Sequence, residues 1–403
     1  MSVAGEVMPR PGARLAIFGR ETFYVAGLYA RQAAIFAGLG LAIVISLDGA
    51  NNSAAILSAP TEQSGLDGPL RLAFYLLLRG TYVLPSILPI GAIVGVVWAE
   101  FILAVSRERI MIANSGRSPS RSLIPALLFG LALGLLQFVA IAYLRPAAVD
   151  AQTSFHFRYY GPRYLQPVTT DAKWMRAGQA AIHARVEITG TAGLRDVLLY
   201  SFASLGRLDA IVTAERATPG PGRDIWTFQQ GSTWDLSRLG AGAGAAAMSM
   251  EPADFASLSR PLHLEPVWVR SVDVLPQLLP QEDLAVLASG NTNIPSGTQY
   301  QSAFHERFGG IFFCVGMALL GAALSLLNFA PGMGPMPALK VGIAGGLAYV
   351  ASNASAMLGN YGNIPPLVAA WSVPVALVVI AFGLVYRRHF RVRALLGDIL
   401  SRR

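Results

Sequence analysis

A polar, strand-like stretch at residues 147–305 separates three membrane-length apolar segments from three more. A bilayer core about 30 Å thick requires about 20 apolar residues in each spanning helix. The apolar segments that meet this length are residues 25–47, 83–105, 123–144, 309–329, 338–359 and 367–386. Of the 403 residues 53% are hydrophobic and only 13% are charged, which fits a membrane protein. We therefore predict an α-helical membrane protein with six transmembrane helices and an inserted all-β domain.

This pattern divides the chain into three parts. Residues 1–146 form an N-terminal membrane half, residues 147–305 the β domain, and residues 306–403 a C-terminal membrane half with a basic tail. An insert between two membrane halves lies on one side of the bilayer, at the opening of any cavity that the two halves enclose. This arrangement favours transport over chemical conversion.

Arginines indicate the orientation of the chain, because Lys and Arg in short loops are retained on the cytoplasmic side. They gather before the first span, between the second and third spans, and after the sixth. They are Arg10, Arg14, Arg20, Arg107, Arg109, Arg117, Arg121, Arg387, Arg388, Arg391, Arg393, Arg402 and Arg403. Both termini are then cytoplasmic, and the insert lies on the outer side of the membrane. No convincing cleavage site follows the first apolar segment, so we expect it to be retained as a span.

The insert shows β-branched and aromatic enrichment between turn signals. The predicted antiparallel strands are residues 180–189, 196–203, 208–216, 225–230 and 264–270. Residues 218–224 indicate a hairpin turn, and the Gly-Ala run at 240–247 indicates a loop. We expect a sandwich, barrel or jelly roll. An apolar interior would receive lipid chains, whereas a filled core would make a docking module.

Motifs for catalysis are absent from the sequence. The five histidines, His156, His183, His263, His305 and His389, are scattered, and the single cysteine, Cys314, lies inside the fourth apolar segment. Neither lysine, Lys173 or Lys340, follows a glycine loop, so the chain has no P-loop for ATP. We expect no metal or cofactor in this chain. The net charge of +8 arises mainly at membrane flanks, so we expect no nucleic-acid partner.

Active transport would then need an ion gradient or a separate motor protein. Arg31 and Glu100 are the candidate intramembrane charges for a gradient, although Arg31 can snorkel and Glu100 can pair with a cytoplasmic arginine. Residues 106–116 offer the alternative, because they predict a short cytoplasmic helix with a partly apolar face and an acidic Glu108. Such a helix can lie in a groove of a motor protein. An ordinary loop, in which Glu108 pairs with neighbouring arginines, remains the other interpretation.

Pairs of glycines and two prolines occur within the predicted spans. The pairs Gly91 and Gly95, Gly130 and Gly134, and Gly342 and Gly346 permit close helix contact, which we assign to packing within the chain. Pro85 and Pro89 predict a kink in the second span.

Six motifs occur in a characteristic order along the chain. They are Arg20-Glu21-Thr22, Leu84-Pro85 with Pro89-Ile90-Gly91-Ala92, Ser106-Arg107-Glu108 with Gly116, Leu144-Arg145-Pro146, residues 195–200, and residues 362–366 with Trp371. In this order and topology the sequence resembles the LptF/LptG (YjgP/YjgQ) permeases over nearly its whole length. Residues 364–366 favour the LptG type, and the choice between the two types stays open.

The resemblance implies a permease subunit of the lipopolysaccharide ABC exporter of Gram-negative inner membranes. It implies pairing with a homologous LptF/LptG-type subunit on a dimeric LptB-like ATPase, where ATP and Mg would bind. The β domain would be a jelly roll that passes lipid to an LptC/LptA-like bridge, and spans one and five would form a lateral gate. Glu108 would engage an arginine of the ATPase, with Arg107 and Arg109 beside it, and Gly116 would end the coupling helix.

One departure from the family pattern concerns the lipid headgroup. Lysines near the outer end of span one are expected in lipopolysaccharide exporters, yet nothing basic lies between Arg31 and Arg71. The nearest substitutes are Arg31, Arg71, Arg79, Arg145 and Arg307. Either the partner subunit supplies positive charge, or the cargo is a less anionic lipid. A membrane scaffold that recruits a periplasmic partner without transport is the alternative from another functional class.

Overall fold

The computed structural model describes residues 19–58, 65–114, 121–155, 171–187, 193–203, 206–220, 225–236, 251–262, 264–271, 274–289, 297–330 and 334–401. Among these residues, six helical segments are long and apolar enough to cross a membrane, as the sequence predicted. They are α1 (Arg20–Leu57), α2 (Gly68–Val105), α4 (Ile124–Val139) continued by the π-helical turn η3 (Ala140–Leu144) and α5 (Arg145–Ser154), α8 (Gly297–Asn328), α9 (Met336–Asn360) and α10 (Pro366–Ser401). The third and fourth segments extend into the part of the sequence that we assigned to the β domain.

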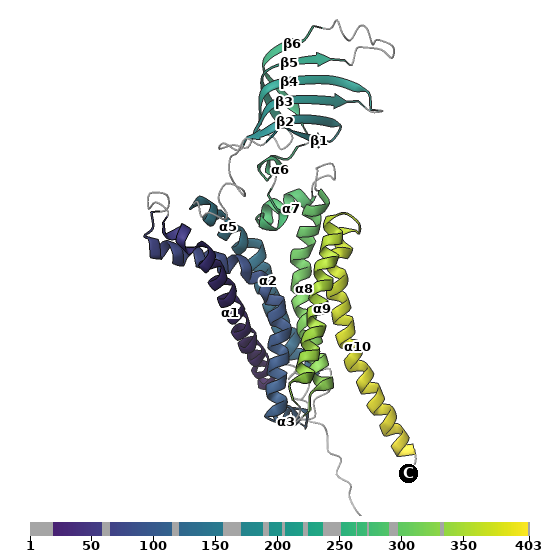
Figure 1. Cartoon of the computed structure of the whole chain (residues 1–403). Coiled ribbons are helices and arrows are strands. Elements are labelled where there is room, and N and C mark those ends of the chain that lie inside the picture. Colours follow the sequence, from purple (N-terminus) through teal and green to yellow (C-terminus); the bar gives the residue numbers. More distant parts are fainter. Residues whose placement is uncertain are drawn as a thin grey trace, which may run out of the picture.

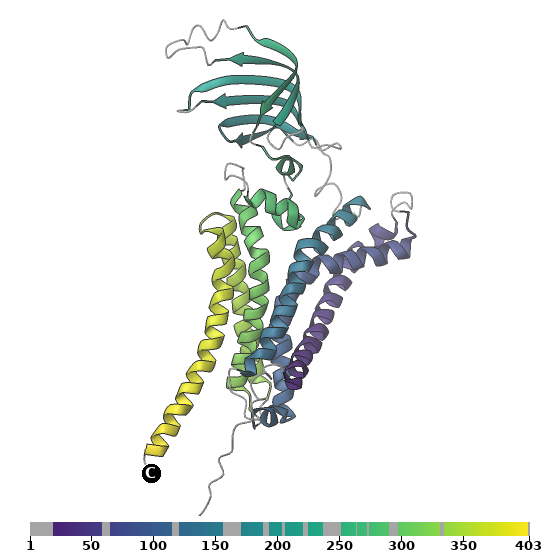
Figure 2. The ribbon, with the colours of Figure 1, turned by 180° about the vertical axis from the view of Figure 1, so that it is seen from behind.

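Helix α8 occupies the middle of the bundle, where it contacts α2, α4, α9 and α10 (Figures 1 and 2). The apolar windows of α2 and α8 are each 67% buried, whereas those of α1 and α9 are only 11% buried. The apolar side chains of α1 and α9 therefore face the surroundings of the chain. Figure 1 also shows that the β-domain ends of α1 and α2 turn away from the bundle.

Glycines allow the closest helix contacts of the bundle. A Cβ atom on Gly134 would lie 2.5 Å from the carbonyl oxygen of Ile311, and one on Gly95 would lie 2.7 Å from the Ala33 backbone. Gly130 meets the α8 backbone in the same way, so these glycines serve packing within the chain, as predicted. Gly342 and Gly346 have open space around them and do not serve such packing.

The insert forms one six-stranded antiparallel sheet, which confirms the predicted all-β domain. Its strands are β1 (Lys173–Ala177), β2 (Ala180–Glu187), β3 (Gly193–Phe202), β4 (Leu208–Pro219), β5 (Ile225–Asp235) and β6 (Ala253–Pro261). Each strand pairs with its neighbours in sequence, and Figure 2 shows that the sheet is curved. Strands β4 and β5 pair up to Pro219 and Trp226, on either side of the predicted turn, whereas residues 221–224 of that turn and residues 240–247 lie outside the described part of the chain.

One face of the sheet carries the core of the domain. Ile182, Leu199 and Val212 lie opposite one another on β2, β3 and β4, and each is at most 2% exposed. Trp226 of β5 is fully buried in the same cluster and donates a hydrogen bond to the carbonyl oxygen of Leu264 at 3.0 Å. Side chains of α6, α7 (Gln281–Ser289) and the start of α8 complete this core.

The prediction of a strand at residues 264–270 was wrong. Helix α6 (Pro266–Arg270) occupies this position, with Pro266 in its first turn. Proline fits there because the first helical N–H groups have no partner within the helix. Trp268 and Val269 are buried against the sheet. The apolar residues of this segment therefore belong to a short helix that covers the core and not to a strand. The edge strands β1 and β6 were missed because polar side chains interrupt them.

Candidate functional site

The short helix α3 (Glu108–Asn114) lies at the end of the bundle opposite the β domain (Figure 1). Arg107 links it to α2 in a left-handed conformation, with φ of 63°. L-residues rarely adopt this conformation, which here changes the chain direction between α2 and α3. The amide N–H of Ile110 donates to the carbonyl oxygen of Arg107 at 3.1 Å and starts α3 directly after the turn.

The apolar side chains of α3 are divided between two environments. Ile112 packs against the bundle core, whereas Ile110 and Met111 are 43% and 65% exposed. The side chain of Glu108 is half-buried beside them. Helix α3 therefore presents an acidic and apolar surface outward. Gly116, which we expected to end this helix, lies outside the described residues.

Two charged side chains of α3 fasten it to the bundle. The hydroxyl group of Tyr24, on α1, donates a hydrogen bond to Glu108 Oε2 at 3.2 Å. Arg109 Nε lies 3.2 Å from Glu100 Oε2, on α2. The sequence left open whether Glu100 pairs with an arginine of the neighbouring connection, and in the structure its partner is Arg109.

Glu100 is the centre of this connection, because it is only 2% exposed and its carboxylate contacts polar side chains of two different helices. Its Oε1 accepts a hydrogen bond from the hydroxyl group of Tyr29, a fully buried side chain of α1. The ring of Tyr29 packs edge-on against Phe129 of α4 at a centroid distance of 6.0 Å. We call Tyr29, Glu100 and Arg109 the buried link, which joins α3 to α1 and α2.

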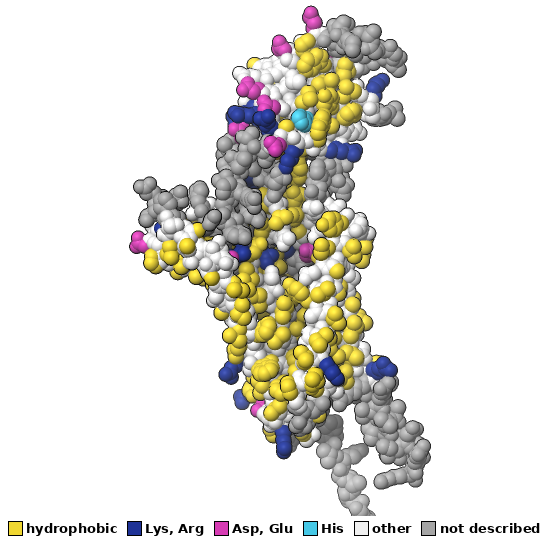
Figure 3. Space-filling view, viewed as in Figure 1, with side chains coloured by type: hydrophobic (Ala, Val, Ile, Leu, Met, Phe, Trp, Pro, Cys, Tyr) yellow, Lys and Arg dark blue, Asp and Glu magenta, His cyan; other side chains and the backbone are white. Residues whose placement is uncertain are grey.

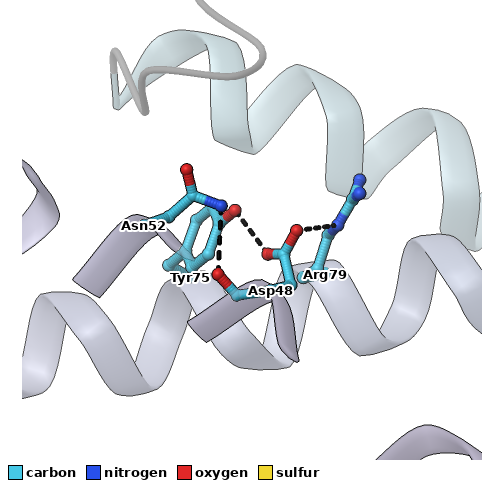
Figure 4. Close-up of polar contacts among 4 residues, drawn as sticks. All are labelled: Asp48, Asn52, Tyr75 and Arg79. Carbon is cyan, nitrogen blue, oxygen red and sulfur yellow. Dashed lines mark hydrogen bonds and ion pairs between the residues drawn. The ribbon is translucent and has the colours of Figure 1, made fainter. Parts of the chain in front are cut away.

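A second polar cluster joins α1 and α2 near the β-domain end of the bundle (Figure 4). Arg79 Nε lies 3.1 Å from Asp48 Oδ1, and the hydroxyl group of Tyr75 donates to Asp48 Oδ2 at 2.6 Å. The side-chain amide of Asn52 donates to the Asp48 carbonyl oxygen at 3.0 Å. Arg79, a candidate for headgroup binding, is therefore engaged by an acid of the same chain.

The other candidate arginines differ in their surroundings. Arg71 donates to the carbonyl oxygen of Leu66 at 3.2 Å, and Arg145 donates to the Tyr82 carbonyl oxygen and the Ser86 hydroxyl, each at 3.1 Å. Arg307 is 2% exposed and donates to Gln281 Oε1 at 2.9 Å and to two carbonyl oxygens at the base of the β domain. Arg31, in contrast, is exposed on α1 and has no polar partner among the described residues.

The family model for the lipopolysaccharide export system permease LptF/LptG matches residues 28–387. This chain belongs to the LptF/LptG family. It is therefore an integral membrane permease subunit of the lipopolysaccharide export system, and the family is a permease rather than an ATPase. No curated protein matches the chain.

In this LptF/LptG chain the buried link is a polar connection that sequence reasoning did not find. Tyr29 gives no signal of its own, since an aromatic residue inside an apolar segment is typical of helix packing. Its partner, Glu100, did stand out, because an ionisable side chain within a span marks a functional position or a buried partner. The five candidate arginines do not all meet at one site. Arg145 and Arg307 line the same cavity, and Arg79 and Arg145 each lie 5.1 Å from the ring centroid of Tyr82.

Proposed function

We propose that this chain extracts lipopolysaccharide or a related amphiphile from the inner membrane and passes it to a periplasmic bridge. In this proposal α3 is cytoplasmic, the β domain is periplasmic, and both termini are cytoplasmic. The partners are a homologous LptF/LptG-type subunit, a dimeric LptB-like ATPase that binds ATP and Mg, and an LptC/LptA-like bridge. Residues Glu108, Arg107, Arg109 and Gly116 form the coupling site, with Glu108 facing the ATPase.

The buried link is the observation that carries this proposal. A helix that only connected two spans would need no buried ion pair, because removing charges from water opposes folding unless they are well paired. Here the pair at Glu100 ties α3 to α2, and the Tyr29 hydrogen bond extends the connection to α1. Displacement of α3 by a bound motor would therefore move α1, one of the two helices whose apolar faces are most open.

The surroundings of the arginines support a cargo less anionic than a typical lipopolysaccharide, or a partner subunit that supplies the missing charge. Asp48 neutralises Arg79, and protein oxygens occupy donors of Arg71, Arg145 and Arg307. Arg31 is the candidate that stays exposed for a headgroup. Lipid entry between α1 and α9 agrees with the exposed apolar windows of these helices.

Purification with the ATPase tests the coupling role. The complex would be isolated through this chain, and bound ATPase and ATP hydrolysis would be measured for the wild type and for Glu108→Arg. We expect the reversed charge to remove the ATPase from the complex. Glu282→Arg is the matched control, because Glu282 is an exposed glutamate on α7, at the other end of the bundle.

Retention of the ATPase by Glu108→Arg, with lipid transport unchanged, would contradict the coupling role. A chain that binds a periplasmic partner but never an ATPase would instead support the scaffold alternative. Mass spectrometry of lipid bound to the purified complex identifies the cargo. Recovery of lipopolysaccharide would exclude the less anionic cargo.

A further inference from the structure

A polar cavity of about 180 Å³ lies among the bundle helices near the β domain. Side chains of α2, α5, α8, α9 and α10 line it, and η3 contributes Ile141. Figure 3 shows charged side chains gathered in a hollow between apolar helix surfaces below the β domain. Charged groups are rare between membrane helices and usually mark binding sites or ion pathways.

Irregular helices surround this cavity. The third span contains the π-helical turn η3, which forms part of the cavity wall. Such turns are frequent at functional sites. Pro85 and Pro374 interrupt the hydrogen bonding of α2 and α10 at two further walls. Pro89 has no N–H to donate to the carbonyl oxygen of Pro85, four residues earlier, and the side-chain amide of Gln137 reaches this freed oxygen at 3.5 Å.

Glu306 of α8 faces the cavity with an unsatisfied carboxyl group. Its Oε1 atom is buried and has no hydrogen-bond partner among the described residues. The two arginines of the cavity do not pair with it, since Arg145 donates to Tyr82 and Ser86, and Arg307 donates toward α7. A buried polar atom without a partner opposes folding by about 1–3 kcal/mol, and more if it is charged.

We propose that this cavity binds an ammonium-bearing headgroup of an amphiphile, with the ammonium group donating to Glu306. The unsatisfied atom is an acceptor, so its ligand must be a donor, and a cation compensates a buried carboxylate best. Asn353, exposed on α9 and without a polar partner among the described residues, offers a further polar contact at the rim.

A phosphate group alone does not fit this position. Two anions at Glu306 would repel each other, while the donors of Arg145 that face Tyr82 and Ser86 are already occupied. A zwitterionic headgroup fits, because its ammonium meets Glu306 while its phosphate remains near the positive charges of Arg145 and Arg307. This inference rests on the proposed function only in taking the ligand to be an amphiphile.

Lipid selectivity of the purified full-length chain with its partner subunits tests the inference. The probes are phosphatidylethanolamine and phosphatidylglycerol with identical acyl chains, which share the phosphate and differ in the ammonium group. Bound lipid would be counted by native mass spectrometry for the wild type, Glu306→Gln and Glu306→Asp. Glu282→Gln is the control, since it removes the same charge from an exposed position outside the cavity.

We expect the wild type and Glu282→Gln to prefer phosphatidylethanolamine by about tenfold, the effect of one charge-assisted hydrogen bond. Glu306→Gln should lose this preference, and Glu306→Asp, which keeps the charge, should retain part of it. Equal binding of both lipids by the wild type, an unchanged preference in Glu306→Gln, or no bound lipid would each overturn the inference. The measurement needs no ATPase, so failure of the coupling role is detected separately.

Discussion

Arg109 of α3 and Glu100 of α2 form a buried ion pair, with Nε and Oε2 3.2 Å apart. The pair lies at the junction where a short connecting helix meets two long membrane helices. Because Tyr29 of α1 donates to the same carboxylate, one acid holds three helices together. This arrangement attaches α3 to both α1 and α2 through buried polar contacts.

Removal of Arg109 should destabilise this junction strongly. Arg109→Gln leaves Glu100 buried without its cation, and breaking one partner of a buried pair typically costs about 3–5 kcal/mol. The double variant Glu100→Gln with Arg109→Gln should recover part of the loss, because no charge stays unpaired. Thermal unfolding of the purified complex, analysed as a double-mutant cycle, measures the coupling. Additive effects of the two changes would argue against the ion pair.

Loss of the Tyr29 hydroxyl should separate ATP hydrolysis from transport. Tyr29→Phe keeps the ring against Phe129 and removes only the hydrogen bond to Glu100, which contributes about 1.5–3 kcal/mol. We expect the ATPase to stay bound and active while lipid release per ATP falls. Tyr24→Phe is the matched control, because its hydroxyl bonds Glu108 at an exposed position and should matter less. Equal transport by both variants would show that the Tyr29 bond transmits nothing.

Gly134 should tolerate no side chain. In Gly134→Ala the new Cβ atom would lie 2.5 Å from the Ile311 carbonyl oxygen, so α4 and α8 must separate. We expect a loss of about 1–3 kcal/mol, as for other overpacked cores, seen as a lower unfolding temperature. Gly342→Ala introduces the same methyl group into open space on α9 and should leave the unfolding temperature nearly unchanged. Similar behaviour of the two variants would contradict the packing described here.

Arg307 should hold the base of the β domain on α8. Arg307→Ala removes its hydrogen bonds to Gln281, Pro276 and Leu279, and the bond to the Leu279 carbonyl oxygen is buried, so this acceptor loses a partner that water cannot easily replace. We predict faster proteolysis near α7, measured by limited digestion and mass spectrometry. Arg270→Ala provides the comparison, since Arg270 also contacts α7, at Asp283, but its side chain is 57% exposed. An exposed ion pair contributes about 0–1 kcal/mol, so cleavage should change little in that variant.

Local sequence patterns were sufficient to predict the helices and strands whose formation depends mainly on hydrophobicity. Six apolar segments of membrane length predicted six helices, because a bilayer leaves a spanning chain few other ways to satisfy its backbone. β-branched and aromatic residues between turn signals similarly predicted strands at β2 to β5 in the insert. Residues 264–270 misled this reasoning, because apolar residues of a short helix over a core resemble those of a buried strand.

Candidate sites were harder to predict than elements. Glu108 and Arg109 are adjacent in the sequence, yet one meets Tyr24 on α1 and the other meets Glu100 on α2. The partners of the arginines could not be predicted either, because the sequence shows only that these residues lie near the ends of membrane spans. Their individual partners, such as Asp48 for Arg79, depend on how α1 and α2 cross, as Figure 4 shows.

The sequence by itself determined the six membrane-length helices, the inserted β domain and the family, because each follows from hydrophobicity and local motifs along the chain. Only the tertiary structure decided which charges are paired, that Tyr29 and Glu100 join α3 to the bundle, and that Glu306 faces a cavity without a partner. Tyr29 and Glu100, for example, are 71 positions apart in the sequence. The packing of long helices brings them together, and no local pattern records which side chains will meet.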